Sequence, residues 1–179
     1  MGRILKNFIF NSFSQLLSII IPLITAPYLS RVLGPDNIGI ESYINAVSQI
    51  FYTIGMLGLT NYAAREIAYV RDNKSDRSKV FWEMMVDRIV VFSLTLLIFM
   101  IVGYNSPYKS FFIIQIVWLF AMFFDASWFF IGMELFELTV LRNFVVRMLT
   151  IISIFALIKD ADDFWLYMVL CAVSQLVGT

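Results

Sequence analysis

The sequence predicts an all-α membrane protein, a polytopic bundle of about six transmembrane helices. Hydrophobic residues make up 60% of the chain and charged residues only 15%, whereas a soluble domain carries roughly 25% charged residues. The mean hydropathy is +0.83. The apolar residues also lie in long runs, and a helix needs about 20 such residues to cross the hydrocarbon core of a bilayer. Composition and run length together favour membrane helices over a soluble core.

Six segments are long and apolar enough, or nearly so, to be spans. In chain order they are residues 8–31, 38–62, 82–103, 110–132, 141–158 and 164–179. Polar or turn-forming stretches separate them at 34–37, 71–77, 105–107 and 159–163. The last segment reaches Thr179 without a flanking charge or turn. We therefore expect residues 1–179 to be the first part of a longer protein.

The first span contains two prolines, Pro22 and Pro27, and is followed by Arg31. Proline inside a helix removes a backbone hydrogen bond and kinks or breaks the helix. An unpaired backbone group is costly in hydrocarbon, so such breaks persist where protein or a water-filled cavity surrounds them. Interrupted helices are the usual sequence pointer to a transporter's binding site. We predict a broken helix here, and Arg31 makes a simple membrane anchor a poor interpretation.

Polar side chains form one stripe along each of the first two spans when residues are placed at 100° intervals. The first stripe comprises Asn7, Asn11, Ser14, Gln15, Ser18, Pro22 and Thr25, and the second comprises Glu41, Asn45, Ser48, Gln49, Tyr52 and Gly55. Such stripes either join packed helices by hydrogen bonds or line a wet cavity. Glu41 favours the cavity, because a carboxylate within a span usually faces water or a cation. If the turn at Gly34 is short, Arg31 of the neighbouring helix is a candidate partner for Glu41.

Further charges lie in or near the later spans. The third span is nearly featureless from Ile89 to Val102 and is predicted to be peripheral. Asp87 and Arg88, at its start, are expected to reach back to the inner interface. Asp125 and Arg147 lie within the fourth and fifth spans. They form either a structural ion pair or a site for a substrate or an ion, and the sequence leaves both alternatives open.

Basic residues are concentrated between the second and third spans, at Arg65, Arg71, Lys74, Arg77 and Lys79. Cytoplasmic loops of membrane proteins carry an excess of Lys and Arg, so we predict that this loop and the N-terminus are cytoplasmic. The same cluster contains acids and lies between two membrane segments, which makes nucleic acid an unexpected partner. Arg65, at the end of the second span, is either an interface residue or a residue at a cavity mouth.

The sequence contains none of the residue patterns that common enzymes use. It has no histidine, which excludes histidine-based catalysis and metal ligation within the chain. Its single cysteine, Cys171, excludes an internal disulfide or a CxxC site. The metalloprotease, serine-hydrolase and P-loop motifs are also missing. We therefore expect no enzyme activity, no metal and no cofactor.

Several short motifs, taken in order, resemble those of a known transporter family. They are Asn11-x3-Gln15, Pro22-x4-Pro27-Tyr28-x2-Arg31-Val32-Leu33-Gly34-Pro35, Ile38-Gly39, Leu57-Gly58-Leu59, Tyr62-x2-Arg65-Glu66-Ile67-Ala68, Asp125-x2-Trp128-Phe129-x2-Gly132-x-Glu134 and Arg142-Asn143. The chain is similar to the polysaccharide repeat-unit flippases, which translocate O-antigen and capsule units. This family belongs to the multidrug/oligosaccharidyl-lipid/polysaccharide exporter superfamily.

The resemblance implies a fold and a set of partners. The chain would be the N-terminal lobe of a two-lobe transporter in the bacterial plasma membrane, with a missing C-terminal lobe as its partner. The substrate would be an undecaprenyl-pyrophosphate-linked oligosaccharide, moved from the cytoplasmic to the outer leaflet. Polysaccharide polymerase machinery is a further expected partner. The alternatives are a cation-coupled multidrug exporter of the same superfamily, an integral-membrane transferase, or a scaffold.

The resemblance also assigns roles to residues. The candidates for the substrate path are Arg31, Glu41, Asn45, Gln49, Asn11, Gln15, Arg65 and Arg147. Arginine matches phosphate oxygens in bidentate fashion, and the amides and hydroxyls of the stripes suit sugar hydroxyls. Coupling to a proton or sodium gradient would fall to Glu41 or Asp125.

Overall fold

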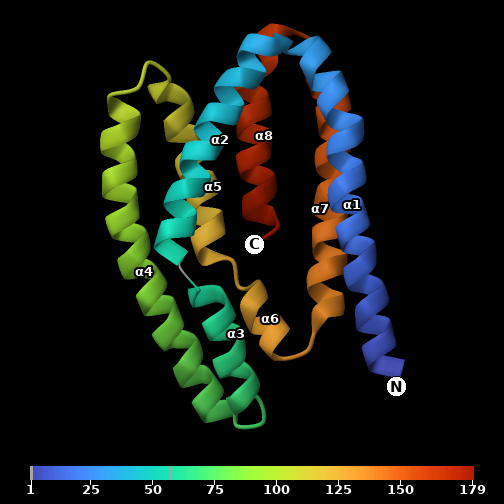
Figure 1. Ribbon diagram of the computed structural model, residues 1–179, viewed down its shortest axis with the longest axis vertical. Coiled ribbons are helices and arrows are strands. Elements are labelled where there is room, and N and C mark those ends of the chain that lie inside the picture. The colour runs from blue at the N-terminus through green and yellow to red at the C-terminus, as the bar shows by residue number, and fades with distance from the viewer. Residues whose placement is uncertain (1, 57) are drawn as a thin grey trace.

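The computed structural model describes residues 2–56 and 58–179, except for the side chains of 2–11, 13, 14, 17, 18 and 136–138. The described residues contain helices and no strand, which confirms the predicted all-α fold class (Figure 1). In chain order the helices are α1 (Gly2–Val32), α2 (Gly34–Met56), α3 (Leu59–Val70), α4 (Lys74–Tyr104), α5 (Lys109–Phe124), α6 (Ser127–Gly132), α7 (Phe136–Leu157), the short 3₁₀ helix η1 (Ala161–Asp163) and α8 (Phe164–Val177).

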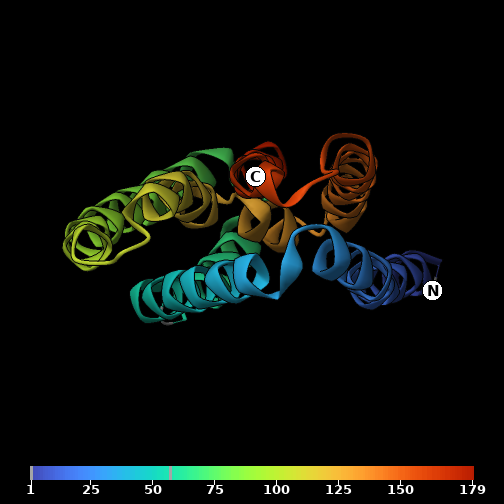
Figure 2. The ribbon, with the colours of Figure 1, turned by 90° about the horizontal axis from the view of Figure 1, so that it is seen from above.

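The long helices lie in two layers. Seen from above, α1 and α2 form one layer, and α4, α5, α8 and α7 form the other (Figure 2). The pairs α5 with α8, α1 with α7, and α2 with α5 pack against each other across or within these layers. The turns after α1, α4 and α7 lie at one end of the bundle, and the loops after α3 and α6 lie at the other (Figure 1). The chain therefore alternates in direction, as a multi-pass membrane protein does.

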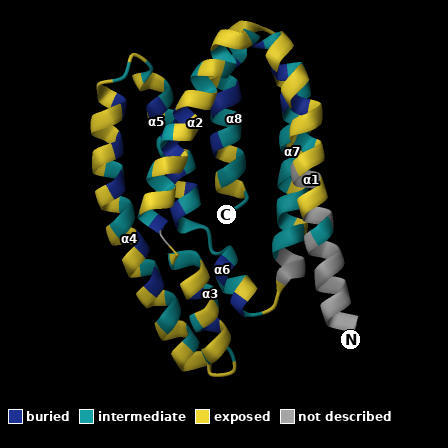
Figure 3. Cartoon of the chain, in the orientation of Figure 1, coloured by how far each residue is buried: buried dark blue, intermediate teal, exposed yellow. Residues whose placement is uncertain are grey.

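The outer surfaces of the bundle are apolar. Among the described residues, three segments are long and apolar enough to cross a membrane: Lys74–Tyr104, Lys109–Gly132 and Thr139–Leu157. α4 lies at the edge of the bundle, and its exposed side chains include Leu94, Leu97 and Ile101 (Figure 3). Because aliphatic side chains at this exposure suit lipid rather than water, the chain is a multi-pass membrane protein.

The predicted break at Pro22 and Pro27 is wrong, because α1 runs through both prolines without interruption. Prolines are tolerated in membrane helices where neighbouring helices and Ser or Thr side chains satisfy nearby backbone groups. Between the two prolines, the Thr25 hydroxyl donates to the Ile21 carbonyl (3.0 Å). One residue beyond them, the Tyr28 hydroxyl donates to the Ile158 carbonyl at the end of α7 (2.6 Å). Packing on α7 thus supports the proline-containing part of α1.

The helix breaks lie instead in the predicted spans 38–62 and 110–132. The first is divided at Gly58, whose φ of 79° is a left-handed conformation that glycine adopts without a steric penalty. The second is divided after Phe124, where the Asp125 carboxylate accepts hydrogen bonds from the Ser127 backbone N–H (3.0 Å) and hydroxyl (2.7 Å). Such local side-chain bonds compete with continuation of a helix.

The predicted third span also begins earlier than expected. α4 starts at Lys74, eight residues before the predicted boundary at 82. Asn73 caps it, and its side-chain oxygen accepts from the backbone N–H groups of Ser75 (3.0 Å) and Asp76 (3.5 Å). Residues 74–77 of the predicted loop 71–77 are therefore helical, and 71–73 remain outside the helix.

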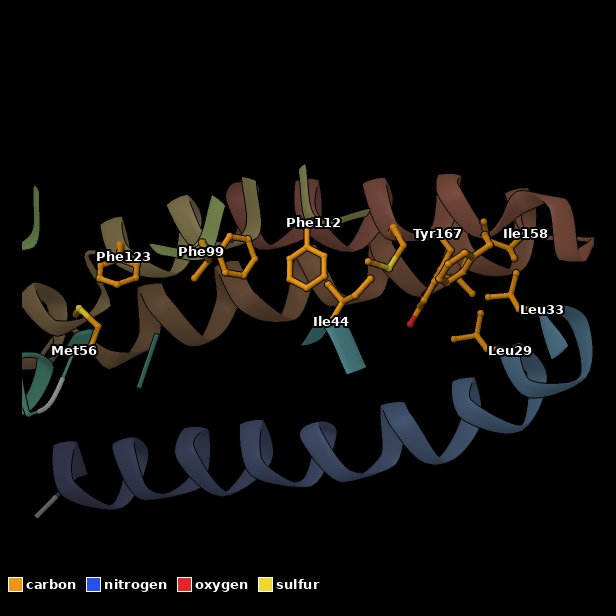
Figure 4. Close-up of a cluster of buried hydrophobic side chains, with 13 residues drawn as sticks. Leu29, Leu33, Ile44, Met56, Phe99, Phe112, Phe123, Ile158 and Tyr167 are labelled. Atoms are coloured by element: carbon orange, nitrogen blue, oxygen red, sulfur yellow. The ribbon is translucent and has the colours of Figure 1, made fainter. Parts of the chain in front are cut away.

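Buried apolar side chains form a continuous strip along the interior. Its labelled members extend from Met56 and Phe123 through Phe99, Phe112 and Ile44 to Leu33 and Ile158 near the α1–α2 turn (Figure 4). A second cluster, made of Ala63, Ile67, Met84 and Trp128, joins α3, α4 and α6. The two clusters hold together the elements that flank both helix breaks.

Gly132 allows α6 to lie directly on α3. A Cβ at this position would lie 2.6 Å from the Ala64 carbonyl oxygen and 2.7 Å from Ile67 Cγ2. We expect Gly132→Ala to lower the free energy of unfolding by about 1–3 kcal/mol, the usual cost of overpacking. Gly39→Ala is the matched control, because a Cβ there meets nothing within 4 Å. Unfolding by SDS titration measures both variants, and equal midpoints for the two would contradict the close approach.

Asp163 holds the turn between α7 and α8. Its Oδ2 accepts hydrogen bonds from the backbone N–H groups of Lys159 (2.8 Å) and Asp160 (3.1 Å). These donors stabilise the carboxylate and hold the pKa of Asp163 below its ordinary value of 3.8. Because the folded pKa is the lower one, the stabilisation is fully present above pH 3.8 and is lost as the pH falls through the folded pKa.

We therefore expect the Lys159 and Asp160 amides to lose protection from hydrogen exchange in acid. The loss should occur below pH 3.8 in the wild-type chain. Asp163→Asn removes the titrating group, so its exchange profile should lack this step. Hydrogen–deuterium exchange followed by mass spectrometry measures both proteins, and superimposable profiles would contradict the assignment.

Candidate functional site

A small polar cavity lies beside the break between α5 and α6. Its volume is about 130 Å³, and α7 and α8 complete its walls. The lining residues are Asp125, Ser127, Asn143, Val146, Arg147, Ser174, Gln175 and Gly178. A water molecule needs only about 10–15 Å³ measured in this way, so the cavity has room for several waters or a polar group. We refer to it as the break cavity.

Asp125 is held at the edge of the break cavity by a partly buried network. Its Oδ1 lies 3.8 Å from an Arg142 guanidinium nitrogen, and the two side chains are 34% and 29% exposed. The same guanidinium donates to the Ser127 hydroxyl (3.2 Å). Asp125 therefore pairs with Arg142, one of the motif residues. The ion pair between Asp125 and Arg147, one of the two alternatives that the sequence left open, is not formed. Arg147 nevertheless lines the same cavity as Asp125.

Arg142 is tightly placed in this network. It also donates to the Thr179 carbonyl beyond α8. Its Nε is buried and has no hydrogen-bond partner among the residues that the structure describes. A buried donor without a partner is costly, so the other hydrogen bonds of Arg142 must offset this cost.

A second polar cluster joins α2 to α5. The Asn45 amide donates to Glu41 (3.3 Å), and the Gln115 amide donates to Asn45 (3.4 Å). Glu41 also interacts electrostatically with Tyr167 and Cys171 of α8. The Glu41 side chain is half-buried and lies on the side of α2 that faces α5 and α8.

The predicted ion pair between Glu41 and Arg31 is wrong. Arg31 is exposed in the last turn of α1 and forms no ion pair with a described residue.

One face of α8 connects the two clusters. Tyr167, Cys171, Ser174 and Gly178 recur at intervals of three or four residues, which places them on one side of a helix. The first two lie near Glu41, and the last two line the break cavity. The sequence analysis predicted neither this face nor the role of Gln115. The helical spacing of the four α8 residues was the signal for the face, and the single amide side chain within α5 was the signal for Gln115.

The other predicted path residues are not brought to this site. Arg65 is exposed on α3, with its guanidinium 6.0 Å from the centre of the Tyr62 ring. α3 and the last turn of α1 lie at opposite ends of the bundle, so Arg65 and Arg31 are not neighbours (Figure 1). Gln15 and Gln49 are exposed. The side chain of Asn11 lies outside the described residues. Arg147 alone of the three proposed arginines lines the polar cavity.

Arg88 has a role that the sequence did not reveal. It was expected at the interface, but only 2% of it is exposed. One guanidinium nitrogen donates to the carbonyls of Phe123 (3.0 Å) and Asp125 (2.8 Å) at the end of α5. The last carbonyls of a helix have no partner within it and carry a partial negative charge. The Arg88 side chain therefore points into the bundle, where the carbonyls at the end of α5 accept its hydrogen bonds, and the predicted reach to the interface is wrong.

Arg88 also reaches the other helix break. Its second terminal nitrogen lies 3.5 Å from the Thr60 hydroxyl in the first turn of α3. Its guanidinium lies 5.2 Å from the centre of the Trp128 ring of α6, within the range of a cation–π contact. Arg88 therefore bridges the α2–α3 and α5–α6 breaks and fixes the backbone of Asp125 beside the break cavity.

Comparison with known proteins places the chain in a family. Residues 4–179 match the family described as "Polysaccharide biosynthesis protein". The chain is 32% identical over 92 residues to a protein of Escherichia coli (strain K12) named "Putative O-antigen transporter", an alignment that covers 51% of this chain. It is 37% identical over 78 residues to a protein of the same name from Shigella flexneri, covering 43% of this chain. No solved structure matches the chain significantly.

The alignments cover 22% and 18% of the lengths of these two relatives. The relatives are named as transporters and not as enzymes. The family match, in contrast, extends over nearly all of this chain and confirms the resemblance predicted from its motifs. The chain belongs to the polysaccharide biosynthesis protein family.

Proposed function

We propose that this chain forms the N-terminal lobe of a flippase for undecaprenyl-pyrophosphate-linked oligosaccharides in the bacterial plasma membrane. The substrate would be a repeat unit of O-antigen or capsule, moved from the cytoplasmic to the outer leaflet. The observation that carries the proposal is the break cavity, a polar site inside an apolar bundle of this family. A polar headgroup crosses a bilayer only if protein groups or water replace its hydration.

The side chains around the break cavity suit such a headgroup. Arg147 provides a guanidinium for pyrophosphate oxygens. Asn143, Ser174 and Gln175 provide amides and a hydroxyl for sugar hydroxyls. The cavity is smaller than a whole repeat unit, so it would hold one part of the headgroup while the rest contacts a second lobe. The lipid tail would stay in the bilayer beside the bundle.

Gradient coupling is assigned to the carboxylates that the polar clusters contain. Asp125 pairs with Arg142 (3.8 Å) and lines the break cavity. Protonation or sodium binding at Asp125 would weaken this pair and change the charge that the substrate meets. Glu41 is the second candidate, because this α2 carboxylate belongs to the polar cluster that joins α2 to α5 and α8. The partners in this proposal are the bilayer, the lipid-linked glycan, a C-terminal lobe and the polymerase that uses the flipped units.

Complementation tests the proposed function. The full-length gene that encodes this chain is expressed in a strain that lacks its own repeat-unit translocase, together with the matching glycan genes. We expect surface polysaccharide to return, as detected by gel electrophoresis of the extracted polysaccharide. Failure to restore it at normal protein levels, combined with restored drug resistance in an exporter-deficient strain, would instead assign the chain to a multidrug exporter.

A further inference from the structure

A groove with an apolar floor and a basic rim lies between the start of α4 and α6. Its volume is about 440 Å³. Phe81, Phe129 and Phe130 form most of the floor, and Lys74, Arg77 and Ser78 form the rim. Aromatic contacts fix the floor: the ring centre of Phe81 lies 5.5 Å from those of both Trp128 and Phe129. We refer to this feature as the basic groove. It is separate from the break cavity.

The basic groove lies at the depth of lipid headgroups. α4 has 31 residues, which corresponds to about 46 Å, whereas the hydrocarbon core of a bilayer is about 30 Å thick. Its residues 89–104 carry no charge and so suit the hydrocarbon. The turns that begin at Lys74 therefore extend beyond it. Trp82, which is 64% exposed, follows them, and exposed tryptophan is typical of the membrane–water interface.

The two cations of the groove differ from their basic neighbours. Arg71 pairs with Glu134 (2.6 Å), and Lys79 lies 3.9 Å from Glu83. Lys74 and Arg77 form no ion pair with any described residue. Arg77 is oriented, because one terminal nitrogen donates to the Arg71 carbonyl (3.2 Å). A guanidinium has five N–H donors, so others remain for a ligand. The groove thus offers two positive charges outside any ion pair of the described residues, above an aromatic floor.

We propose that the basic groove binds an anionic phospholipid of the surrounding leaflet. The phosphate contacts Lys74 and Arg77, and the glycerol and the first methylenes of the acyl chains pack on the phenylalanine floor. Basic pockets between membrane helices are suited to anionic headgroups, and the continuous apolar floor selects a lipid over a free phosphate. The lipid would bridge α4 to α6. It would thereby support the α5–α6 break, because Ala126 lines the groove and its neighbours Asp125 and Ser127 line the break cavity.

Lipid binding by the purified full chain tests this proposal. Phosphatidylglycerol or phosphatidylcholine is titrated into the protein in detergent, and native mass spectrometry counts the bound lipid. We expect wild-type protein to bind phosphatidylglycerol at least tenfold more tightly than phosphatidylcholine. Lys74→Gln/Arg77→Gln should remove that preference. Lys79→Gln/Lys159→Gln, which also removes two positive charges but leaves the groove unchanged, should keep it within twofold.

Two further arms make the result decisive. Arg77→Lys keeps the charge and should retain most of the preference, which separates a lost ligand contact from misfolding of the double variant. Soluble glycerol 3-phosphate should not compete with phosphatidylglycerol. Equal binding of the two lipids by wild-type protein, equal losses in the two double variants, or full competition by glycerol 3-phosphate would each overturn the proposal.

Discussion

Replacing Arg88 by methionine is expected to lower the free energy of unfolding by about 3 kcal/mol. Each hydrogen bond from a charged donor contributes roughly 1.5 kcal/mol or more, and Arg88 donates two to the carbonyls of Phe123 and Asp125. Methionine has a similar length and fills the space, but it cannot donate. The two carbonyls at the end of α5 would then be buried without these donors, which is why the expected effect is large.

SDS titration followed by circular dichroism measures this loss. Asp87→Asn is the matched control, because Asp87 is the exposed neighbour of Arg88 on the same helix. Arg88→Lys should recover part of the stability, since an ammonium group can reach one of the carbonyls. An unfolding midpoint for Arg88→Met equal to that of Asp87→Asn would show that Arg88 does not hold the two breaks together.

Replacing Arg147 by alanine is expected to reduce transport at least tenfold in the complementation assay. A tenfold change corresponds to about 1.4 kcal/mol, which is within the contribution of one charge-assisted hydrogen bond to phosphate. Arg147 lines the break cavity, whereas Arg31 and Arg65 are exposed on the last turn of α1 and on α3, which lie at opposite ends of the bundle (Figure 1). Arg31→Ala and Arg65→Ala should therefore retain most of the wild-type activity.

The comparison is made at matched protein levels in the membrane, measured by immunoblotting. Arg147→Lys should show intermediate activity, because it keeps the charge and loses the bidentate geometry. Loss of transport in Arg31→Ala or Arg65→Ala, together with normal transport in Arg147→Ala, would move the substrate path away from the break cavity.

The fold class followed from the sequence because it depends on composition and run length alone. The positions of the helix breaks did not. Proline is the stronger helix-breaking signal in the sequence, yet α1 continues through Pro22 and Pro27 because it packs on α7. The break at Gly58 depends on a positive φ, and the break at Asp125 depends on a local bond to Ser127. A glycine or an aspartate within a helix-forming segment breaks the helix only where the surrounding structure favours the break.

The candidate site was predictable only in part for a related reason. Asp125 and Arg147 stood out as charges within apolar segments, and the structure brings both to one cavity. Their partners are set by packing between distant elements: Arg142 pairs with Asp125, and α8 contributes Ser174 and Gln175. The direction of the Arg88 side chain could not be predicted from its own segment, because its acceptors are the carbonyls at the end of α5.

A direct binding measurement is the closest test of the proposal that the break cavity binds the pyrophosphate headgroup. Undecaprenyl pyrophosphate is titrated into the purified full-length protein in detergent, and tryptophan fluorescence reports binding. We expect Arg147→Ala to weaken binding at least tenfold, whereas Arg65→Ala should stay within twofold of the wild-type value. Equal affinities for Arg147→Ala and the wild-type protein would contradict the claim.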